Sequence, residues 1–129
     1  MDPNENQTDN ARTRREPHVI DQISVADLKA ALDAGSARLI DVREKHEFDS
    51  GHVPGAAWIP MSLVPLRMDE FRSTEPVYVV CRTGNRSGQV VMWLANQGIQ
   101  TVNVAGGTVT WQNQGFPLEI GTAGRTVAQ

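Results

Sequence analysis

The sequence predicts an α/β protein whose parallel sheet is covered by helices on both faces. Two observations predict this fold class. Short runs of strand-forming residues alternate along the chain with segments in which apolar residues recur at helical spacing. The strand-like runs are also apolar without interruption, as in Val77-Tyr78-Val79-Val80, a pattern typical of strands that are buried on both faces.

Length and composition fit one globular domain. The chain has 129 residues, of which 40% are hydrophobic and 21% charged, so there is enough apolar material for a core. Residues 1–16 are almost entirely polar and are expected to form a flexible tail. Residues 17–120 then form the domain, and the small and polar residues 121–129 form a second loose end. No internal repeat suggests a tandem arrangement.

Charge and cysteine content exclude several kinds of partner. The formal charge of −3 gives no reason to expect nucleic acid or an anionic membrane surface. No stretch approaches the ~20 apolar residues of a membrane span, and residues 1–16 lack the apolar core of a signal peptide. A single cysteine excludes an intrachain disulfide and a multi-cysteine zinc site and fits a reducing compartment. A cytoplasmic location is therefore the default expectation.

The first predicted elements are a short strand over 18–23 and a helix that starts after Ser24. Asp27 stands three residues beyond Ser24, as in a capping box with Asp in place of Glu. Gly35 occupies the position of a C-terminal helix cap. Residues 39–42 then form a short buried strand.

The segment 44–76 is predicted to contain only short elements. A helix over 44–49 should end at Ser50-Gly51, and a turn at 53–55 should lead into a strand at 58–59. Between Pro60 and Pro76, apolar and charged residues mix in a pattern that suggests a short amphipathic helix and a connection into the strand 77–80.

Beyond that strand the pattern predicts helix, strand and helix again. The first helix begins near Gly88 and ends at Gly98. A strand follows over 102–104, and a glycine turn leads into a helix over 108–114. Trp111 on this last helix is expected to lie in the core.

The only cysteine, Cys81, stands where a buried strand opens into a helix. Amides at a helix N-terminus have no intrahelical partners and carry the positive end of the helix dipole. Arg82 and Arg86 add positive charge, and Gly84 permits a backbone conformation in which amides converge. We therefore expect a thiol with a depressed pKa and a reactive sulfur. The alternative is an inert core cysteine, but buried guanidiniums would need anionic partners beside it.

Charged and imidazole side chains elsewhere have two interpretations. Asp41 and Arg43 follow a buried strand and are expected to pair locally, or else one of them tunes the Cys81 pocket. His46 is expected on the surface and His52 in a structural turn. No set of carboxylates and histidines has ligand-like spacing, so neither metal nor cofactor is expected.

The residues around Cys81 resemble the active-site loop of the rhodanese family, the thiosulfate sulfurtransferases. The matching loop residues are Cys81, Arg82, Gly84, Arg86 and Ser87. A second family signature is similar to the stretch that begins with Asp41-Val42-Arg43 and continues through Glu47-Phe48, Gly51-His52, Pro54-Gly55-Ala56 and Ile59-Pro60. The C-terminal pattern matches at Gly106-Gly107, Trp111, Gly115 and Pro117.

The resemblance covers roughly residues 19–118 and implies a three-layer α/β/α sandwich with a five-stranded parallel sheet. It implies that Cys81 takes a sulfane sulfur from thiosulfate or a related donor as a persulfide. A thiol or protein acceptor in the cell, or cyanide in an assay, then removes that sulfur. The guanidiniums of Arg82 and Arg86 would attract the small anionic donor. The anion-binding loop as a whole comprises Arg82, Thr83, Gly84, Asn85, Arg86 and Ser87. Ser87 is expected either to add a hydroxyl contact to the bound group or to cap the helix, and the cap is favoured.

Other functions stay open on the sequence. In cysteine phosphatases the loop between cysteine and arginine is one residue longer than the four residues between Cys81 and Arg86, which disfavours phosphoryl transfer. An arsenate reductase would need a resolving cysteine, which this chain lacks. A module that docks a protein partner is the alternative from a different class. The physiological donor, the acceptor and the oligomeric state stay undetermined.

Overall fold

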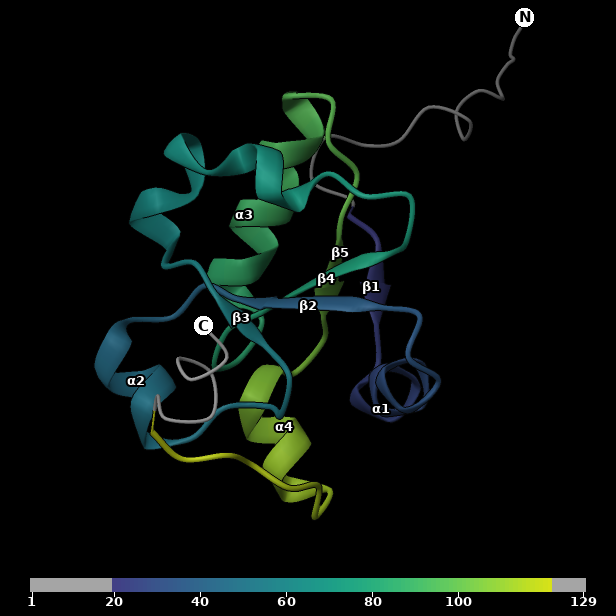
Figure 1. Cartoon of the computed structure of the whole chain (residues 1–129), viewed down its shortest axis with the longest axis vertical. Helices are drawn as coiled ribbons and strands as arrows, with labels where there is room; N and C mark the ends of the chain where they lie inside the picture. The colour runs from purple at the N-terminus through teal and green to yellow at the C-terminus, as the bar shows by residue number, and fades with distance from the viewer. Residues whose placement is uncertain (1–19, 122–129) are drawn as a thin grey trace, which may run out of the picture.

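The structure, a computed structural model, describes residues 20–121 and is built around one parallel sheet (Figure 1). The five strands lie in the order β1-β5-β4-β2-β3, and every pair of neighbours is parallel. Their bounds are Gln22–Ile23 for β1, Arg38–Asp41 for β2, Ala57–Trp58 for β3, Val77–Val80 for β4 and Val102–Val104 for β5. The predicted tails, 1–16 and 121–129, fall outside the described residues except for Gly121.

Helices cover both faces of this sheet. One face carries three α-helices, α1 (Val25–Asp33), α2 (Lys45–Ser50) and α4 (Gly107–Asn113). The other face carries α3 (Asn85–Asn96) and two 3₁₀ segments, η1 (Met61–Leu66) and η2 (Met68–Phe71) (Figure 1). The predicted fold class and its three layers are therefore confirmed.

The position of strand β4 between two cores explains why the run Val77–Val80 is apolar without interruption. Side chains alternate along a strand, and those of Val77 and Val79 enter the core under α3, whereas Tyr78 and Val80 enter the core under α1 and α4. All four residues are buried. Each buried valine contributes about 1.5–3 kcal/mol relative to an exposed one, so the two cores fix the strand between them.

Helix α1 forms as its sequence predicts. The Ser24 hydroxyl accepts a hydrogen bond from the Asp27 amide at 3.1 Å, which satisfies one of the free amides of the first turn. Leu28 is fully buried under the helix. The chain leaves the helix through Gly35, whose φ of +77° is the left-handed conformation predicted for a terminating glycine.

Several element boundaries differ from the prediction. The predicted strand 18–23 is described only over Gln22–Ile23, since residues 18 and 19 lie outside the described part. The amphipathic helix expected between Pro60 and Pro76 is replaced by η1 and η2. Pro65 lies inside η1 and has no amide proton to donate, which favours short 3₁₀ turns over a longer α-helix.

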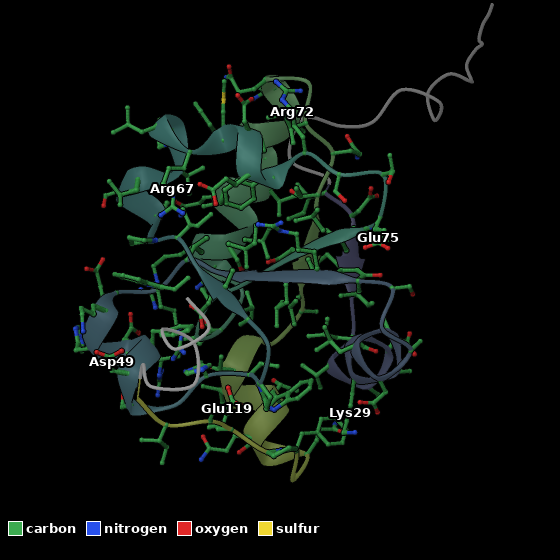
Figure 2. All side chains as sticks on the ribbon, in the orientation of Figure 1. Lys29, Asp49, Arg67, Arg72, Glu75 and Glu119 are labelled. Atoms are coloured by element: carbon green, nitrogen blue, oxygen red, sulfur yellow. The ribbon has the colours of Figure 1, made fainter. Side chains whose placement is uncertain are left out.

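Long charged side chains, with the exception of the buried Arg43, lie at the surface around these layers. Figure 2 shows Lys29, Arg72 and Glu75 near the outline of the ribbon. No helix among the described residues is long and apolar enough to cross a membrane.

The sheet brings the carboxyl ends of β2 and β4 together. Asp41 of β2 lies in register with Val80 of β4, so the residues that follow both strands share one edge. This edge, at the carboxyl ends of the strands, is the one at which open α/β sheets bind ligands.

Candidate active site

The loop after β4 turns sharply from strand into helix. Cys81 is the first residue beyond β4, and α3 begins four residues later at Asn85. The residue before the helix, Gly84, has φ +104° and ψ −7°, a left-handed conformation that side-chain-bearing residues rarely adopt. The helix therefore starts three residues earlier than the predicted start near Gly88, because Gly84 allows the chain to turn at once.

The sulfur of Cys81 lies inside this turn and is surrounded by hydrogen-bond donors. The amide of Gly84 is 3.1 Å from Sγ and the amide of Ser87 is 3.3 Å from it. The Ser87 hydroxyl oxygen is 3.2 Å away. Cys81 itself is only 1% exposed, so the sulfur faces protein dipoles in place of water.

Burial and hydrogen bonding shift the pKa of Cys81 in opposite directions. Burial of the thiol favours the neutral form and is the largest single influence. Hydrogen bonds from the Ser87 hydroxyl and from the amides of Ser87, Gly84 and Thr83 together outweigh it. The net result is a pKa of Cys81 below its ordinary value, as the sequence predicted, but the lowering comes chiefly from amides and a hydroxyl group and less from guanidiniums.

Of the two roles expected of Ser87, the structure shows the hydroxyl contact and not the favoured helix cap. Gly84 occupies the N-cap position, and Ser87 lies fully buried in the first turn of α3. Its hydroxyl points inward, toward Cys81 Sγ and toward Asn103 Oδ1, the latter at 2.5 Å. The helix starts early enough to carry Ser87 under the sulfur.

Arg86 is engaged by a carboxylate from another element. Two guanidinium nitrogens of Arg86 contact the two oxygens of Glu47 on α2, at 2.8 and 2.9 Å. This bidentate bond is the main cause that lowers the pKa of Glu47 to about 2, and the same bond raises the pKa of Arg86. Much of the Arg86 charge is thereby offset, which leaves less of it for an incoming anion than the sequence suggested.

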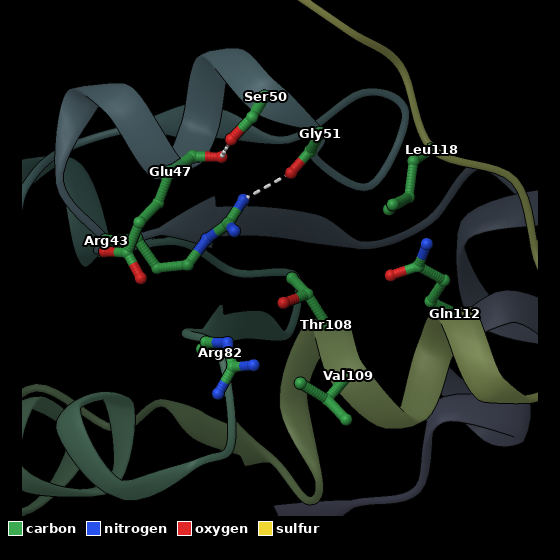
Figure 3. Close-up of a pocket in the computed structure, with 9 residues that line it drawn as sticks. All are labelled: Arg43, Glu47, Ser50, Gly51, Arg82, Thr108, Val109, Gln112 and Leu118. Carbon is green, nitrogen blue, oxygen red and sulfur yellow. Dashed lines mark hydrogen bonds between the residues drawn. The ribbon is translucent and has the colours of Figure 1, made fainter.

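Arg82 is the loop cation that remains available. Its side chain is exposed and forms no ion pair with any residue in the described range 20–121. It lines a polar pocket of about 250 Å³ between α2 and α4. Figure 3 shows Arg82 and Arg43 on one side of this pocket, with Gln112 and Leu118 across from them.

Asp41 and Arg43 form the local pair that the sequence predicted. The guanidinium of Arg43 contacts both carboxylate oxygens of Asp41 at 2.9 to 3.0 Å, and both side chains are almost fully buried. Arg43 also donates to the carbonyl of Gly51 at 2.7 Å, just after α2. The pair therefore fastens the end of β2 to the end of α2.

The start of α4 supports the Cys81 loop from behind. The amides of Thr108 and Val109 donate to the carbonyls of Cys81 and Arg82 at 2.9 and 3.0 Å. Gly107 makes this approach feasible, since a Cβ atom there would lie 2.3 Å from the Arg82 carbonyl oxygen. The second predicted glycine of the turn is thus required by close packing against the loop.

Thr83 and Asn85, the other predicted loop residues, have exposed side chains, and only the Thr83 amide contributes to the environment of the sulfur. Of the two histidines, His46 lies at the surface as expected, whereas His52 belongs to an isolated β-bridge with Glu119 and not to a turn. His46 is exposed, whereas His52 is buried and stacks on Phe48 with ring centroids 3.8 Å apart. Within residues 20–121, no three His, Cys, Asp or Glu side chains gather as a metal site.

Two residues beside the loop were missed by the sequence interpretation. Glu47 was noted only as part of the second family signature, and nothing local marks it as the partner of Arg86. Asn103 is a buried amide between two apolar residues on β5. That signal could have been used, because a buried polar group at the centre of a short strand needs partners.

Comparison with known proteins gives this geometry a family. The sequence profile of the Rhodanese-like domain family matches residues 24–114, which contain the loop, β5 and the start of α4. The chain belongs to this family. The match confirms the resemblance that the loop residues suggested.

Relatives and solved structures agree with this assignment. The rhodanese-like chain is 38% identical over 99 residues to the Bacillus subtilis protein YtwF, covering 76% of this chain and 96% of the relative. It is 33% identical over 102 residues to a protein of Allochromatium vinosum named sulfurtransferase, and the match covers 78% of this chain and 95% of that relative. A rhodanese-like domain protein from Staphylococcus aureus superposes with a TM-score of 0.70 at 37% identity, over 78% of this chain and 98% of that one.

This rhodanese-like domain therefore presents one ionisable sulfur among convergent donors. A thiolate in such a cradle is a nucleophile, and the same donors would stabilise negative charge on an atom bonded to it. Covalent chemistry at sulfur is what the arrangement can support.

Proposed function

We propose that this chain is a sulfurtransferase that carries a sulfane sulfur as a persulfide on Cys81, with thiosulfate or a related anionic sulfur compound as donor. The observation that carries the proposal is the set of two amides and one hydroxyl group that lie within 3.1 to 3.3 Å of the Cys81 sulfur. Family membership and relatives named sulfurtransferases support it.

The reaction is a double displacement. The Cys81 thiolate attacks the outer sulfur of thiosulfate and forms a new S–S bond. The electron pair of the old S–S bond leaves with sulfite, so a dianionic donor yields a dianionic product and the enzyme keeps one negative charge, now on the outer persulfide sulfur. An acceptor such as cyanide then attacks that outer sulfur, thiocyanate departs, and the electron pair of the persulfide bond restores the Cys81 thiolate.

Residues around the sulfur have distinct parts in this reaction. Gly84 and Ser87 donate to the sulfur and lower the energy of its anionic forms. Arg82 is exposed and unpaired among the described residues, so it is suited to attract the anionic donor and to stabilise charge on departing sulfite. Arg86 is held by Glu47 and acts mainly to fix α2 against α3 beside the loop.

Mass spectrometry of the intact protein tests the proposal. Incubation with thiosulfate is expected to add one sulfur atom to the wild-type mass, and cyanide should remove it with release of an equal amount of thiocyanate. Because Cys81 is the only cysteine, Cys81→Ser should gain no sulfur under the same conditions. A parallel incubation with a small-thiol persulfide shows whether the donor can be other than thiosulfate.

A wild-type protein that gains no sulfur from either donor would contradict the proposal and favour a module that docks a partner. Hydrolysis of a phenyl phosphate by the wild type, lost in Cys81→Ser, would instead assign the loop to phosphoryl transfer.

A further inference from the structure

Asn103 lies in contact with the loop through both ends of its side-chain amide. Its Nδ2 atom donates to the carbonyl of Gly84 at 3.2 Å and to Gln22 Oε1 at 3.1 Å. Its Oδ1 atom faces the Ser87 hydroxyl at 2.5 Å. The Gly84 carbonyl is an obligatory acceptor, so the amide is oriented with nitrogen toward Gly84 and oxygen toward Ser87.

This orientation creates a competition for one proton. Two oxygens 2.5 Å apart need a hydrogen between them, and the Asn103 oxygen has none to give. The Ser87 hydroxyl must therefore donate to Asn103, and its lone pairs then face Cys81 Sγ at 3.2 Å. That arrangement accepts a hydrogen bond from a protonated thiol. A thiolate needs the opposite, a Ser87 hydroxyl that has rotated to donate to sulfur and has left Asn103.

We propose that Asn103 is a positioning residue that competes with Cys81 for the hydroxyl proton of Ser87 and thereby limits how readily the thiol ionises. The protonated state is a chain from thiol to Ser87 to Asn103. The ionised state breaks the link to Asn103 and directs the same hydroxyl to the sulfur. The hydroxyl lowers the pKa of Cys81, and without the Asn103 carbonyl it would do so further.

Charged groups near the sulfur are unchanged between these two states. Arg86 of α3 is paired with Glu47 of α2, and Asp41 of β2 is paired with Arg43. Arg82 is the remaining charge of the loop. From β5 and α4, the groups that pack against the loop are the uncharged Asn103 and Thr108. The competition therefore acts through a hydrogen bond and needs no charge to move.

Asn103→Leu is the informative variant, because the loop keeps its other supports. The Gly84 carbonyl still accepts from the Gly88 amide at 3.0 Å, and Gln22 is exposed and can turn to water. Removal of the carbonyl frees the Ser87 hydroxyl, so the pKa of Cys81 should fall by about one unit. Ser87→Ala removes the hydroxyl altogether and should raise the pKa by a similar amount.

The double variant Ser87→Ala/Asn103→Leu isolates the pathway. If Asn103 acts only through Ser87, the double variant has the pKa of Ser87→Ala alone, within about 0.3 unit. Gln22→Ala is the matched control, since it removes a partner of Asn103 and leaves Ser87 untouched. In this variant the pKa of Cys81 should stay at the wild-type value. Asn103→Val, which suits a strand, is measured beside Asn103→Leu and should shift in the same direction.

The experiment measures the rate of alkylation of the single cysteine by iodoacetamide across pH, with cooperative thermal unfolding as the check on folding. Below both pKa values, Asn103→Leu should react about threefold faster than wild type, because a tenfold larger thiolate fraction is offset by a lower intrinsic nucleophilicity. Above both values it should react about threefold slower. This crossing of the two pH profiles is not expected from a loosened loop.

Several outcomes would overturn the inference. One is a pKa of Cys81 that is raised or unchanged in folded Asn103→Leu and Asn103→Val. Another is a double variant in which the shift of the Cys81 pKa equals the sum of the shifts in the two single variants. Loss of cooperative unfolding in both Asn103 variants would also overturn it, since the residue would then act as a structural support. The consequence for sulfur transfer rests on the proposed function, but the titration does not. A protein that takes up no sulfur yet shows these shifts would contradict the function and leave the inference standing.

Discussion

At Cys81, burial and hydrogen bonding act on the same sulfur in opposite directions. Burial alone would keep the thiol protonated, and the donors of Gly84 and Ser87 reverse that preference. The sequence predicted the direction of this shift from the strand-to-helix position of the cysteine. It could not predict that Ser87 would contribute more than either arginine, because that depends on where α3 begins.

Arg82 should steer anionic donors to the loop. We expect Arg82→Met to lower the second-order rate constant for sulfur uptake from thiosulfate by about tenfold at low salt, with the difference shrinking as ionic strength rises. Alkylation by iodoacetamide, which is neutral, should be unchanged and serves as an internal control. Arg72→Met, at the exposed residue that follows η2, should alter neither rate. Equal losses toward both reagents would instead mean that Arg82 shapes the loop itself.

Glu47 should stabilise the fold in a pH-dependent way. Its pKa is lowered from 4.5 to about 2, so its contribution is fully present above pH 4.5 and is lost as pH falls through about 2. Glu47→Gln should therefore reduce the free energy of unfolding by about 1 kcal/mol at neutral pH. Near pH 2, where Glu47 is protonated, the reduction should be small. The effect at neutral pH is modest because the ion pair is partly exposed. Urea unfolding at both pH values measures this, with exposed Glu75→Gln as control. An equal loss at both pH values would contradict the assignment.

Among the elements, strands and major helices followed from sequence patterns, whereas their exact starts did not. A continuous apolar run marked β4, and the apolar residues of 39–42 marked β2. Ser24 with Asp27 marked the start of α1. The start of α3 was missed because a left-handed Gly84 opens the helix without a capping side chain. The short amphipathic helix predicted between Pro60 and Pro76 is two 3₁₀ segments, and the type of helix could not be predicted because 3₁₀ and α patterns differ little over six residues.

Gly107 should be irreplaceable at the contact between α4 and the loop. Gly107→Ala places a Cβ atom 2.3 Å from the Arg82 carbonyl oxygen, whereas Gly35→Ala meets nothing within 4 Å, and both positions have positive φ. The alanine at 35 should therefore destabilise by about 1–2 kcal/mol from backbone strain alone. We expect at least twice that loss at 107, together with slower sulfur uptake. Denaturant unfolding of both variants measures the two losses. Equal losses in the free energy of unfolding would show that close packing against the Arg82 carbonyl does not add to the cost at Gly107.

The buried pair of Asp41 and Arg43 should matter more than any surface pair. Arg43→Met leaves a buried carboxylate without its cation and is expected to lower the free energy of unfolding by about 3–5 kcal/mol. Lys29→Met breaks the exposed pair with Asp33 and should change it by less than about 1 kcal/mol. Chemical denaturation of the two variants tests the difference. A loss below about 1 kcal/mol in Arg43→Met would show that the pair does not hold α2 in place.

Across the whole molecule, the site forms because three regions of the chain that are far apart in sequence meet at one sheet edge. The order β1-β5-β4-β2-β3 puts the ends of β2, β4 and β5 side by side, and α2 and α4 close over them. Sequence motifs located the cysteine and its loop, since those residues are contiguous. Glu47 and Asn103 contact the loop from 39 and 16 residues away from their partners Arg86 and Ser87, and no local pattern encodes such pairings.

The pKa of the Cys81 thiol, measured in the folded protein and again in the same chain unfolded by urea, tests the central claim most directly. Alkylation rates across pH give both values, and because the chain has one cysteine each rate reports this thiol alone. The account predicts a lower pKa in the folded state, so folding should gain stability as pH rises from the folded value to the unfolded one. A folded pKa equal to or above the unfolded one would contradict it.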